Sequence, residues 1–243
     1  DQWLMTTQGS LLETRGLTAF YGDFQALFGI DFRVELGETV AIIGSNGAGK
    51  STFLRSITGL IRNEPDSLLY EGRSIGSEKA HCIVGRGIAM VPEGRQLFPS
   101  LTVEENLKIG AYSKRPGPWN LERLYKLFPI LNERKHHGGT ELSGGQQQMV
   151  AIGRALMSNP KLLLCDEISL GLAPIIIKDI YDALPSICAE GTTVVVVEQD
   201  VQQAMVVSDR VYCFQKGRVS LEGDPDLLDR EQVTAAYFGV GEG

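Results

Sequence analysis

Apolar residues at the start of the chain occur in short runs separated by glycine, as in "LLETRGLTAFYG", "GIDFRVELG" and "TVAIIG". Such runs are typical of β-strands, and the most continuous of them predict strands buried on both faces. The period then changes: in "KSTFLRSITGL" the apolar Phe53, Leu54 and Ile57 recur at helical spacing, and Gly59 ends the run. Residues 11–60 therefore predict a group of strands followed by a helix.

A helical pattern fills the middle of the chain and an α/β pattern returns after it. "LTVEENLKIGAY" and "LERLYKLFPILNERK" are amphipathic at helical spacing and flank the turn-forming "KRPGPW". The apolar runs "RGIAMVPEG", "KLLLCDE" and "TTVVVVEQD" predict buried strands, with the helix "GQQQMVAIGRALMSNP" among them. "RVYCF" and "RVSLEG" predict the last strands, and a short helical tail follows.

These elements predict an α/β fold with a mainly parallel sheet, an N-terminal antiparallel β patch and a helical lobe. Residues 11–243 are expected to form a single domain, with the helical lobe at about 96–155 and a short C-terminal tail at about 222–243. Residues 1–10 are expected to be a flexible leader or a remnant of cloning. Phe20 and Phe24 are expected in the core.

Composition narrows the classes of partner. The net charge is −7 and no lysine- or arginine-rich run is present, which argues against a nucleic-acid partner but not against binding a single nucleotide. No segment has the roughly 20 apolar residues of a membrane helix. The cysteines lack the spacing of a metal site, so packed free thiols in a reducing compartment are expected. They are Cys82, Cys165, Cys188 and Cys213.

A phosphate-binding motif, "GSNGAGKST", follows the third apolar run and opens the first helix. It fits G-x-x-x-x-G-K-[ST] in the strand-to-helix context that makes the motif specific, and predicts a P-loop NTPase core. Glycines let the backbone amides turn toward phosphate oxygens, Lys50 supplies positive charge, and the Ser51 hydroxyl can ligate Mg²⁺. The residues expected to contact ATP here are Gly44, Ser45, Asn46, Gly47, Ala48, Gly49, Lys50, Ser51 and Thr52.

Two acidic residues end the buried run "LLLCDE". Asp166 is placed to hold Mg²⁺, and Glu167 is placed to orient or deprotonate an attacking water. An acidic turn after a buried strand is common by itself. The phosphate loop in the same chain makes a hydrolysis site the better interpretation.

The segment "LSGGQ", residues 142–146, is the most specific motif of the chain. Ser143 is expected to cap the next helix, and the glycines leave its first amides bare, so this helix N-terminus predicts a second anion site. The residues of this second site are Ser143, Gly144, Gly145 and Gln146.

With these motifs the chain resembles the ATP-binding-cassette (ABC) ATPases from about Leu11 to Phe238. The resemblance implies that two cassettes pair head to tail, so that LSGGQ of one subunit contacts ATP on the phosphate loop of the other. It also implies that Tyr21 in "FYGDFQAL" stacks on adenine, although a packed tyrosine of the β patch remains the alternative.

Three positions depart from the usual pattern of that family and indicate one branch. The glutamine that senses Mg²⁺ falls on Glu93, an aspartate of the dimer interface falls on Ala173, and the histidine near the γ-phosphate falls on Gln199. Ile168 also replaces a usual proline. Together "VPEGR", "SLGLAP" and "VEQ" resemble the second ATPase of branched-chain amino acid importers and its relatives for amides or urea. Glu167, Gln199 and Lys50 are then the expected catalytic residues, and Ser51, Asp166 and Glu93 the expected Mg²⁺ site.

This resemblance implies an ATP- and Mg²⁺-dependent ATPase on the cytoplasmic face of the cell membrane, coupling ATP-driven dimer closure to transport. The implied partners are a second ATPase subunit, identical or different, permease subunits facing residues 95–112, and indirectly an extracytoplasmic solute-binding protein. The departures leave open a low-activity subunit that clamps ATP beside a more active cassette. A lipid exporter also remains open. A chromosome or DNA-repair ATPase needs long coiled coils, for which residues 53–141 leave no room.

Overall fold

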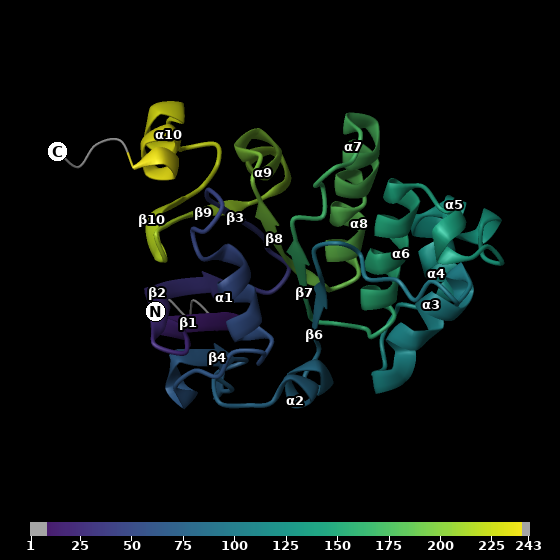
Figure 1. Cartoon of the computed structure of the whole chain (residues 1–243), viewed down its shortest axis with the longest axis horizontal. Coiled ribbons are helices and arrows are strands. Elements are labelled where there is room, and N and C mark those ends of the chain that lie inside the picture. Colours follow the sequence, from purple (N-terminus) through teal and green to yellow (C-terminus); the bar gives the residue numbers. More distant parts are fainter. Residues whose placement is uncertain (1–8, 240–243) are drawn as a thin grey trace, which may run out of the picture.

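The computed structural model describes residues 9–239, which form two sheets and a set of helices around them (Figure 1). Residues 1–8 of the expected leader and residues 240–243 at the end of the expected tail lie outside the described residues. The strands are β1 (Leu12–Tyr21), β2 (Phe24–Val34), β3 (Thr39–Ile43), β4 (Leu68–Tyr70), β5 (Arg73–Ser74), β6 (Ile88–Val91), β7 (Leu162–Asp166), β8 (Thr193–Glu198), β9 (Arg210–Gln215) and β10 (Arg218–Gly223).

The helices are α1 (Lys50–Ile57), α2 (Ala80–Gly85), α3 (Val103–Gly110), α4 (Leu121–Leu127), α5 (Pro129–Glu133), α6 (Gly144–Leu156), α7 (Pro174–Asp182), α8 (Leu184–Ala189), α9 (Val201–Val207) and α10 (Arg230–Phe238). Short 3₁₀ turns lie at η1 (Pro65–Ser67), η2 (Ala111–Ser113) and η3 (Gly139–Glu141). The α/β class, the mainly parallel sheet, the antiparallel patch and the helical lobe are confirmed.

The central sheet has six strands in the order β10-β9-β3-β8-β7-β6. All neighbours are parallel except the edge pair β9–β10. Every residue of β3, β7 and β8 is buried, which explains their nearly continuous apolar runs. The register places Ile43 beside Glu198 and Asp166 beside Val197. The carboxyl ends of these three strands therefore meet at one edge.

Each face of this sheet has its own hydrophobic core. Ala41, Leu163 and Val196 belong to the core formed with α3–α9 and the C-terminal helix α10, whereas Ile42, Leu164 and Val197 belong to the core formed with α1, α2 and the antiparallel sheet. Successive residues of a strand alternate between the two cores, as the strand period requires. Layers on both faces thus hold the strands that carry the site.

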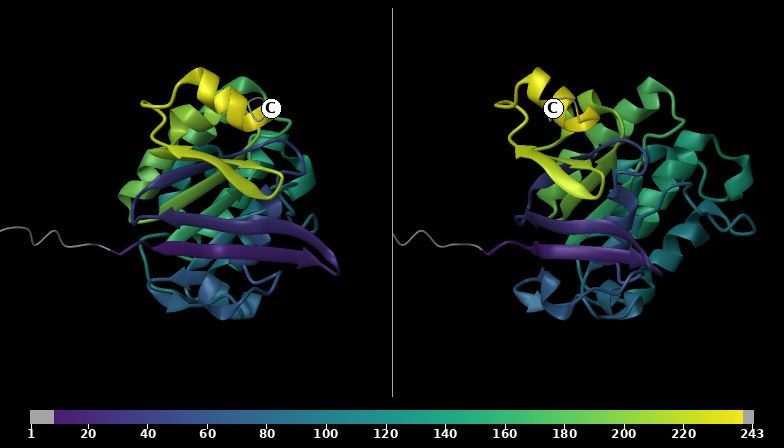
Figure 2. Two further views of the ribbon diagram at one scale, coloured as in Figure 1. Left: turned by 90° about the vertical axis from the view of Figure 1, so that its left-hand side faces the viewer. Right: turned by 60° about the vertical axis from the view of Figure 1, so that its left-hand side comes forward.

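The antiparallel sheet, in the order β2-β1-β4-β5, lies against one side of the central sheet (Figure 2). Its β1–β2 pair has register shifts at several points along its length, the last of them between Ala19 and Phe20, close to the turn after Tyr21. The expectation that Phe20 and Phe24 are core residues is wrong, because they are 49% and 69% exposed. They lie at the end of the β1–β2 pair. No other layer of the described part of the protein covers the side chains there, so the alternation of the strand does not bury them.

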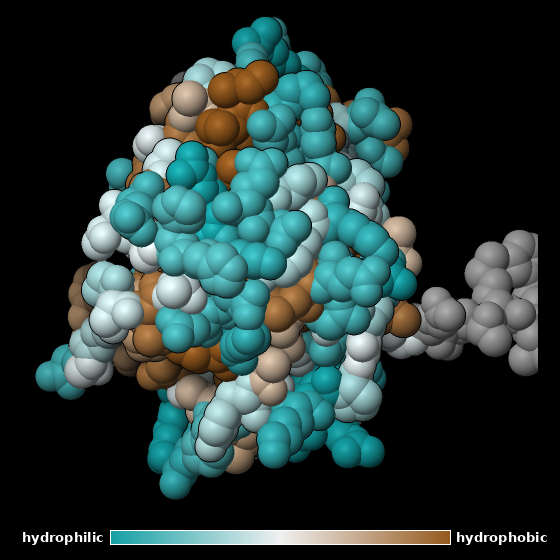
Figure 3. Space-filling model, turned by 90° about the vertical axis from the view of Figure 1, so that its right-hand side faces the viewer, coloured by the Kyte–Doolittle hydropathy of each residue, from teal (hydrophilic) through white to brown (hydrophobic). Residues whose placement is uncertain are grey.

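Helices α3–α6 form the lobe that projects beside β6 and β7 (Figure 1). Thr102 caps α3, with Glu105 completing a capping box, and Asn120 caps α4. Trp119 is buried between this lobe and the body of the chain. The outer face of the lobe is mainly hydrophilic, with apolar residues gathered in separate places (Figure 3).

The helices and the cysteines test two further expectations from the sequence. Among residues 9–239 no helix is long and apolar enough to cross a membrane. The four cysteines are free, with Cys165 and Cys213 buried as expected and Cys82 exposed.

Candidate functional site

A cavity of about 850 Å³ opens at the carboxyl edge of the central sheet, beside the N-terminus of α1. Strands far apart in sequence contribute to it because their ends meet at this edge. Its lining residues are Tyr21, Phe24, Gln25, Ala26, Phe28, Asn46, Gly47, Gly49, Lys50, Ser51, Thr52, Glu93, Glu167, Leu170, Gln199 and Lys216.

The phosphate loop connects β3 to α1 and presents Lys50 to this cavity. Gly49 has φ 104°, a left-handed conformation, and an added Cβ would lie 2.7 Å from the Leu27 side chain. Lys50 is only 4% exposed, and its Nζ donates to the carbonyl oxygens of Gly44 at 2.6 Å and Ser45 at 3.1 Å. Burial lowers the pKa of Lys50 below its usual value. No side chain caps α1, so its first amides remain available for a ligand.

Asp166, the last residue of β7, faces the start of α1. Ser51 Oγ donates to Asp166 Oδ1 at 3.5 Å. Burial, and then the neighbouring Glu167, raise the pKa of Asp166 to about 6. A buried carboxylate beside a hydroxyl is a donor set that suits Mg²⁺, which uses few protein ligands and retains water and phosphate oxygens. The residues therefore fit this ion, which would also favour the charged form of Asp166.

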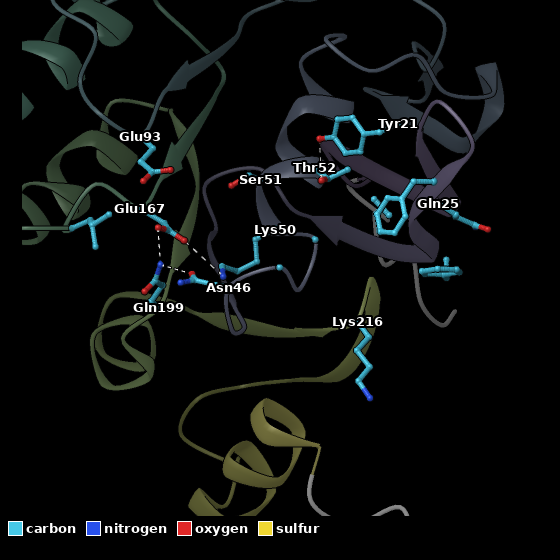
Figure 4. Close-up of a pocket in the computed structure, with 16 residues that line it drawn as sticks. Tyr21, Gln25, Asn46, Lys50, Ser51, Thr52, Glu93, Glu167, Gln199 and Lys216 are labelled. Atoms are coloured by element: carbon cyan, nitrogen blue, oxygen red, sulfur yellow. Dashed lines mark hydrogen bonds and ion pairs between the residues drawn. The ribbon is translucent and has the colours of Figure 1, made fainter.

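Glu167 lies at the centre of a network of polar contacts. Its Oε1 is 3.7 Å from Lys50 Nζ, and its Oε2 accepts a hydrogen bond of 2.9 Å from Gln199 Nε2. The same amide nitrogen donates to Asn46 Oδ1 at 2.8 Å (Figure 4). Glu167 has φ 48°, a left-handed conformation that is uncommon for a residue with a side chain. The three residues expected to be catalytic are thus brought together.

Tyr21 lies on the opposite side of the cavity from Glu167 (Figure 4). Its hydroxyl is 3.2 Å from Thr52 Oγ1 and accepts from Arg55 at 3.5 Å. The ring is 43% exposed, so it is not a packed core residue of the β patch. Phe24, at 69% exposed, lines the same side. Exposed aromatic rings beside a phosphate loop can stack on a base.

Glu93 also lines the cavity, on the loop after β6. It is exposed and makes no side-chain hydrogen bond or ion pair with the described residues. Ala173 is the N-cap residue of α7 and has no side chain that can bond to a partner. Ile168 is only 2% exposed and packs into the core, so the residue in the place of the usual proline anchors this loop by burial.

The LSGGQ segment begins α6 away from this cavity. Ser143 Oγ accepts from the Gln146 amide at 3.2 Å, and Gln146 Oε1 accepts from the Ser143 amide at 3.1 Å, a complete capping box. An added Cβ at Gly145 would lie 2.3 Å from Ile176 Cγ2, so this glycine permits close packing of α6 on α7. None of these residues lines the Lys50 cavity within the described part of the chain. The two predicted anion sites of one chain are separate.

Sequence reasoning missed several residues of the site. Phe28 and Lys216 line the cavity but belong to no recognised motif, and Leu170 lines it from within "SLGLAP", where no role was expected for it. Glu198 was not assigned a role, yet it is 1% exposed at the end of β8. A charged residue that ends a run of four valines was the available signal.

Comparison with known proteins places the chain among transport ATPases. The family model described as "ABC transporter" matches residues 27–169. The chain is 44% identical to the high-affinity branched-chain amino acid transport ATP-binding protein BraG of Pseudomonas aeruginosa, over 92% of this chain and 97% of that protein. The chain belongs to the ABC transporter family. It is also 35% identical to the probable branched-chain amino acid transport ATP-binding protein LivF of Archaeoglobus fulgidus, over 95% of this chain and 99% of that one.

Solved structures of ABC ATPases have the same fold. A nucleotide-free ATP-binding cassette from an ABC transporter matches with a TM-score of 0.81 and 29% identity, covering 96% of this chain and all of that one. A dimeric cassette in a post-hydrolysis state, bound to ADP and inorganic phosphate, matches with a TM-score of 0.78 and 28% identity, covering 88% of this chain and 98% of the other. This ABC protein is an ATP-binding transport ATPase.

Proposed function

We propose that this ABC subunit binds Mg²⁺–ATP in the Lys50 cavity and drives the import of branched-chain or related small amino acids. The contact of Glu167 with both Lys50 and Gln199 supports hydrolysis at this site more than any other single observation. The 44% identity to an ATPase named for branched-chain amino acid transport supports the cargo.

The phosphates of ATP accept hydrogen bonds from the free amides of α1 and from the ammonium group of Lys50. Lys50 now donates to two backbone carbonyls of its own loop, and phosphate oxygens are stronger acceptors because they carry charge. The other loop residues line the tri-phosphate path. Tyr21 stacks on adenine, and its bond to Thr52 fixes the ring relative to the loop. The residues assigned to nucleotide binding are Tyr21, Gly44, Ser45, Asn46, Gly47, Ala48, Gly49, Lys50, Ser51, Thr52, Glu93 and Asp166.

Glu167 acts as the base that takes a proton from the attacking water. Gln199 donates to one oxygen of Glu167 and leaves the other beside Lys50, so the amide orients the carboxylate without accepting a proton itself. Ser51 and Asp166, with Glu93 reaching from its loop, would hold Mg²⁺, which supplies positive charge to the phosphates when bound.

Ser143, Gly144, Gly145 and Gln146 contact the ATP held by a second ATPase subunit. This assignment rests on the separation of α6 from the Lys50 cavity: one chain cannot apply both anion sites to one nucleotide. The partner is an identical or a related cassette. ATP-driven closure then draws the two together.

The segment from residue 95 to residue 112, which includes α3, faces the permease at the inner face of the membrane. Phe98, Ile109 and Tyr112 are exposed there at 48%, 40% and 92%. Exposed apolar side chains in one segment are typical of a protein interface. A solute-binding protein outside the membrane acts on this subunit only through the permease.

A second candidate is a subunit that clamps ATP with little turnover of its own. Two positions favour it: Glu93 is exposed, unbonded within the described residues and carries a carboxylate where the family pattern has an amide, and Ala173 has no polar side chain. The network around Glu167 favours hydrolysis instead.

Solute-stimulated ATP hydrolysis by the complete complex in lipid vesicles tests the cargo. Leucine, isoleucine and valine, presented with the binding protein, are expected to raise phosphate release several-fold. Urea, short amides and a lipid substrate are tested in the same assay as alternative cargoes. Stimulation by one of these alone contradicts the amino-acid proposal and leaves the ATPase site in place.

A further inference from the structure

Glu198 is a buried carboxyl group that the proposed mechanism does not use. It ends β8 and is 1% exposed, and it does not line the Lys50 cavity. Burial raises its pKa to about 7. Ser169 Oγ donates to Oε2 at 2.9 Å, while Oε1 has no hydrogen-bond partner among the described residues. Burying such a group costs folding free energy, so an apolar residue would serve the sheet better.

Ser169 connects this buried group to the loop that carries the proposed base. The loop joins β7 to α7, and Ser169 lies two residues after Glu167. Leu172 N donates to Ser169 O at 3.2 Å, and Leu170 N donates to Glu167 O at 3.2 Å, so the loop is a pair of tight turns. A displacement of Ser169 is therefore transmitted to Glu167.

Three hydrogen bonds tie this loop to the end of β8. The Glu167 amide donates to Val197 O at 3.0 Å, Gln199 Nε2 donates to Glu167 Oε2 at 2.9 Å, and Ser169 Oγ donates to Glu198 Oε2 at 2.9 Å. Glu198, the last residue of β8, is buried and holds the loop from the interior, whereas Gln199, the next residue, lines the cavity and holds the loop from that side. Glu167 needs such support because its φ of 48° is unfavourable.

We propose that Glu198 is a positioning residue for ATP hydrolysis, which through Ser169 holds the Glu167 loop in the conformation that directs the carboxylate toward the phosphate loop. The inference rests on the proposed role of Glu167. Glu198 is buried and does not line the cavity in which ATP is proposed to bind. Glu198 holds the loop because its side-chain oxygen accepts the hydrogen bond from Ser169, and a negative charge on Glu198 is not required.

Four variants of the chain in its complete complex test this role by steady-state ATP hydrolysis. Glu198→Gln keeps an acceptor oxygen for Ser169 and is expected to retain kcat within about twofold. Glu198→Leu and Ser169→Ala each lose the bond and are expected to lower kcat about tenfold or more, while KM for ATP changes less than about threefold. The double variant Glu198→Leu/Ser169→Ala is expected to be no slower than the slower single variant, because both remove one contact.

Thr193→Val is the matched control, since it removes a buried hydrogen-bonding group at the other end of β8. Thr193 Oγ1 accepts from the Gly37 amide at 2.8 Å, far from the loop along the strand. This variant is expected to lower the melting temperature without lowering kcat. If Glu198→Leu does not fold, Ser169→Ala tests the same contact. Ser169 is only half-buried, so its replacement by alanine is expected to leave the chain folded.

Unchanged kcat in Ser169→Ala, additive losses in the double variant, or failure of Glu198→Gln to preserve the rate would each overturn the proposal. Glu167→Gln is measured in parallel. If that variant hydrolyses ATP normally, the proposed function itself fails. If it is inactive while Ser169→Ala is normal, only the role of Glu198 fails.

Discussion

The N-termini of α1 and α6 are both expected to bind phosphate, yet they differ in their helix caps. The first turn of α1 has no side-chain cap and lies beside the buried ammonium of Lys50. The first turn of α6 is closed by the reciprocal bonds of Ser143 and Gln146. An uncapped helix end beside a buried cation is incomplete without an anion, whereas the capped end is stable alone. This difference supports the proposal that α1 holds the nucleotide and that α6 completes a site held by another subunit.

Lys50→Ala is expected to have the largest effect on this arrangement. It removes the only cationic side chain within the phosphate loop, and ATP affinity is expected to fall about a hundredfold or more, with loss of measurable hydrolysis. Calorimetric titration with ATP gives the affinity. Lys178→Ala, on the exposed face of α7, is the charge-matched control. Retained ATP affinity in Lys50→Ala would place the nucleotide elsewhere.

Ser143→Asp distinguishes the roles of the two helix N-termini more directly. Aspartate caps a helix as well as serine does, so α6 is expected to remain folded, but its charge repels a phosphate brought by a partner. We expect hydrolysis in the complex to fall about a hundredfold while ATP binding to the isolated chain is unchanged. Asn120→Asp adds the same charge at the N-cap of α4 and serves as control. Weakened binding to the isolated chain would mean that α6 does not act across an interface.

Gln199→Ala is expected to have an intermediate effect, because it removes the donor to Glu167 and Asn46 but leaves both acceptors. A loss of about tenfold is expected in the rate constant of single-turnover hydrolysis. Gln199→His can still donate and is expected to retain most of the rate. An unchanged rate in the alanine variant would reduce Gln199 to a loop residue.

Tyr21→Ala is expected to have the smallest effect of the four on the rate of hydrolysis. Stacking on a base contributes about 1–3 kcal/mol, so ATP affinity is expected to fall roughly five- to 150-fold with little change in kcat. Tyr21→Phe keeps the ring and loses only the bond to Thr52, so its affinity is expected to stay within about twofold. Equal losses in both variants would show that the hydroxyl, rather than the ring, contributes the binding energy.

The sequence predicted the carboxyl edge of the central sheet well and its surroundings less well. Lys50, Asp166 and Gln199 each follow a buried apolar run, and parallel strands bring such ends to one edge. The exposure of Phe20 and Phe24 could not be derived from the pattern, because alternation does not show which face of an edge pair lacks a cover. The bond from Ser169 to Glu198 joins a loop residue to the last residue of β8 and depends on tertiary contact alone.

The role of Glu167 as the base of an ATP-hydrolysing site is the central claim, and Glu167→Gln tests it most directly. Glutamine is close to glutamate in size and keeps an oxygen to accept from Gln199, but it cannot take a proton from water. ATP affinity and phosphate release are measured on the same preparation of the complex. We expect affinity within about threefold of the unsubstituted protein and phosphate release lower by about a hundredfold or more. Phosphate release at the unsubstituted rate would contradict the account.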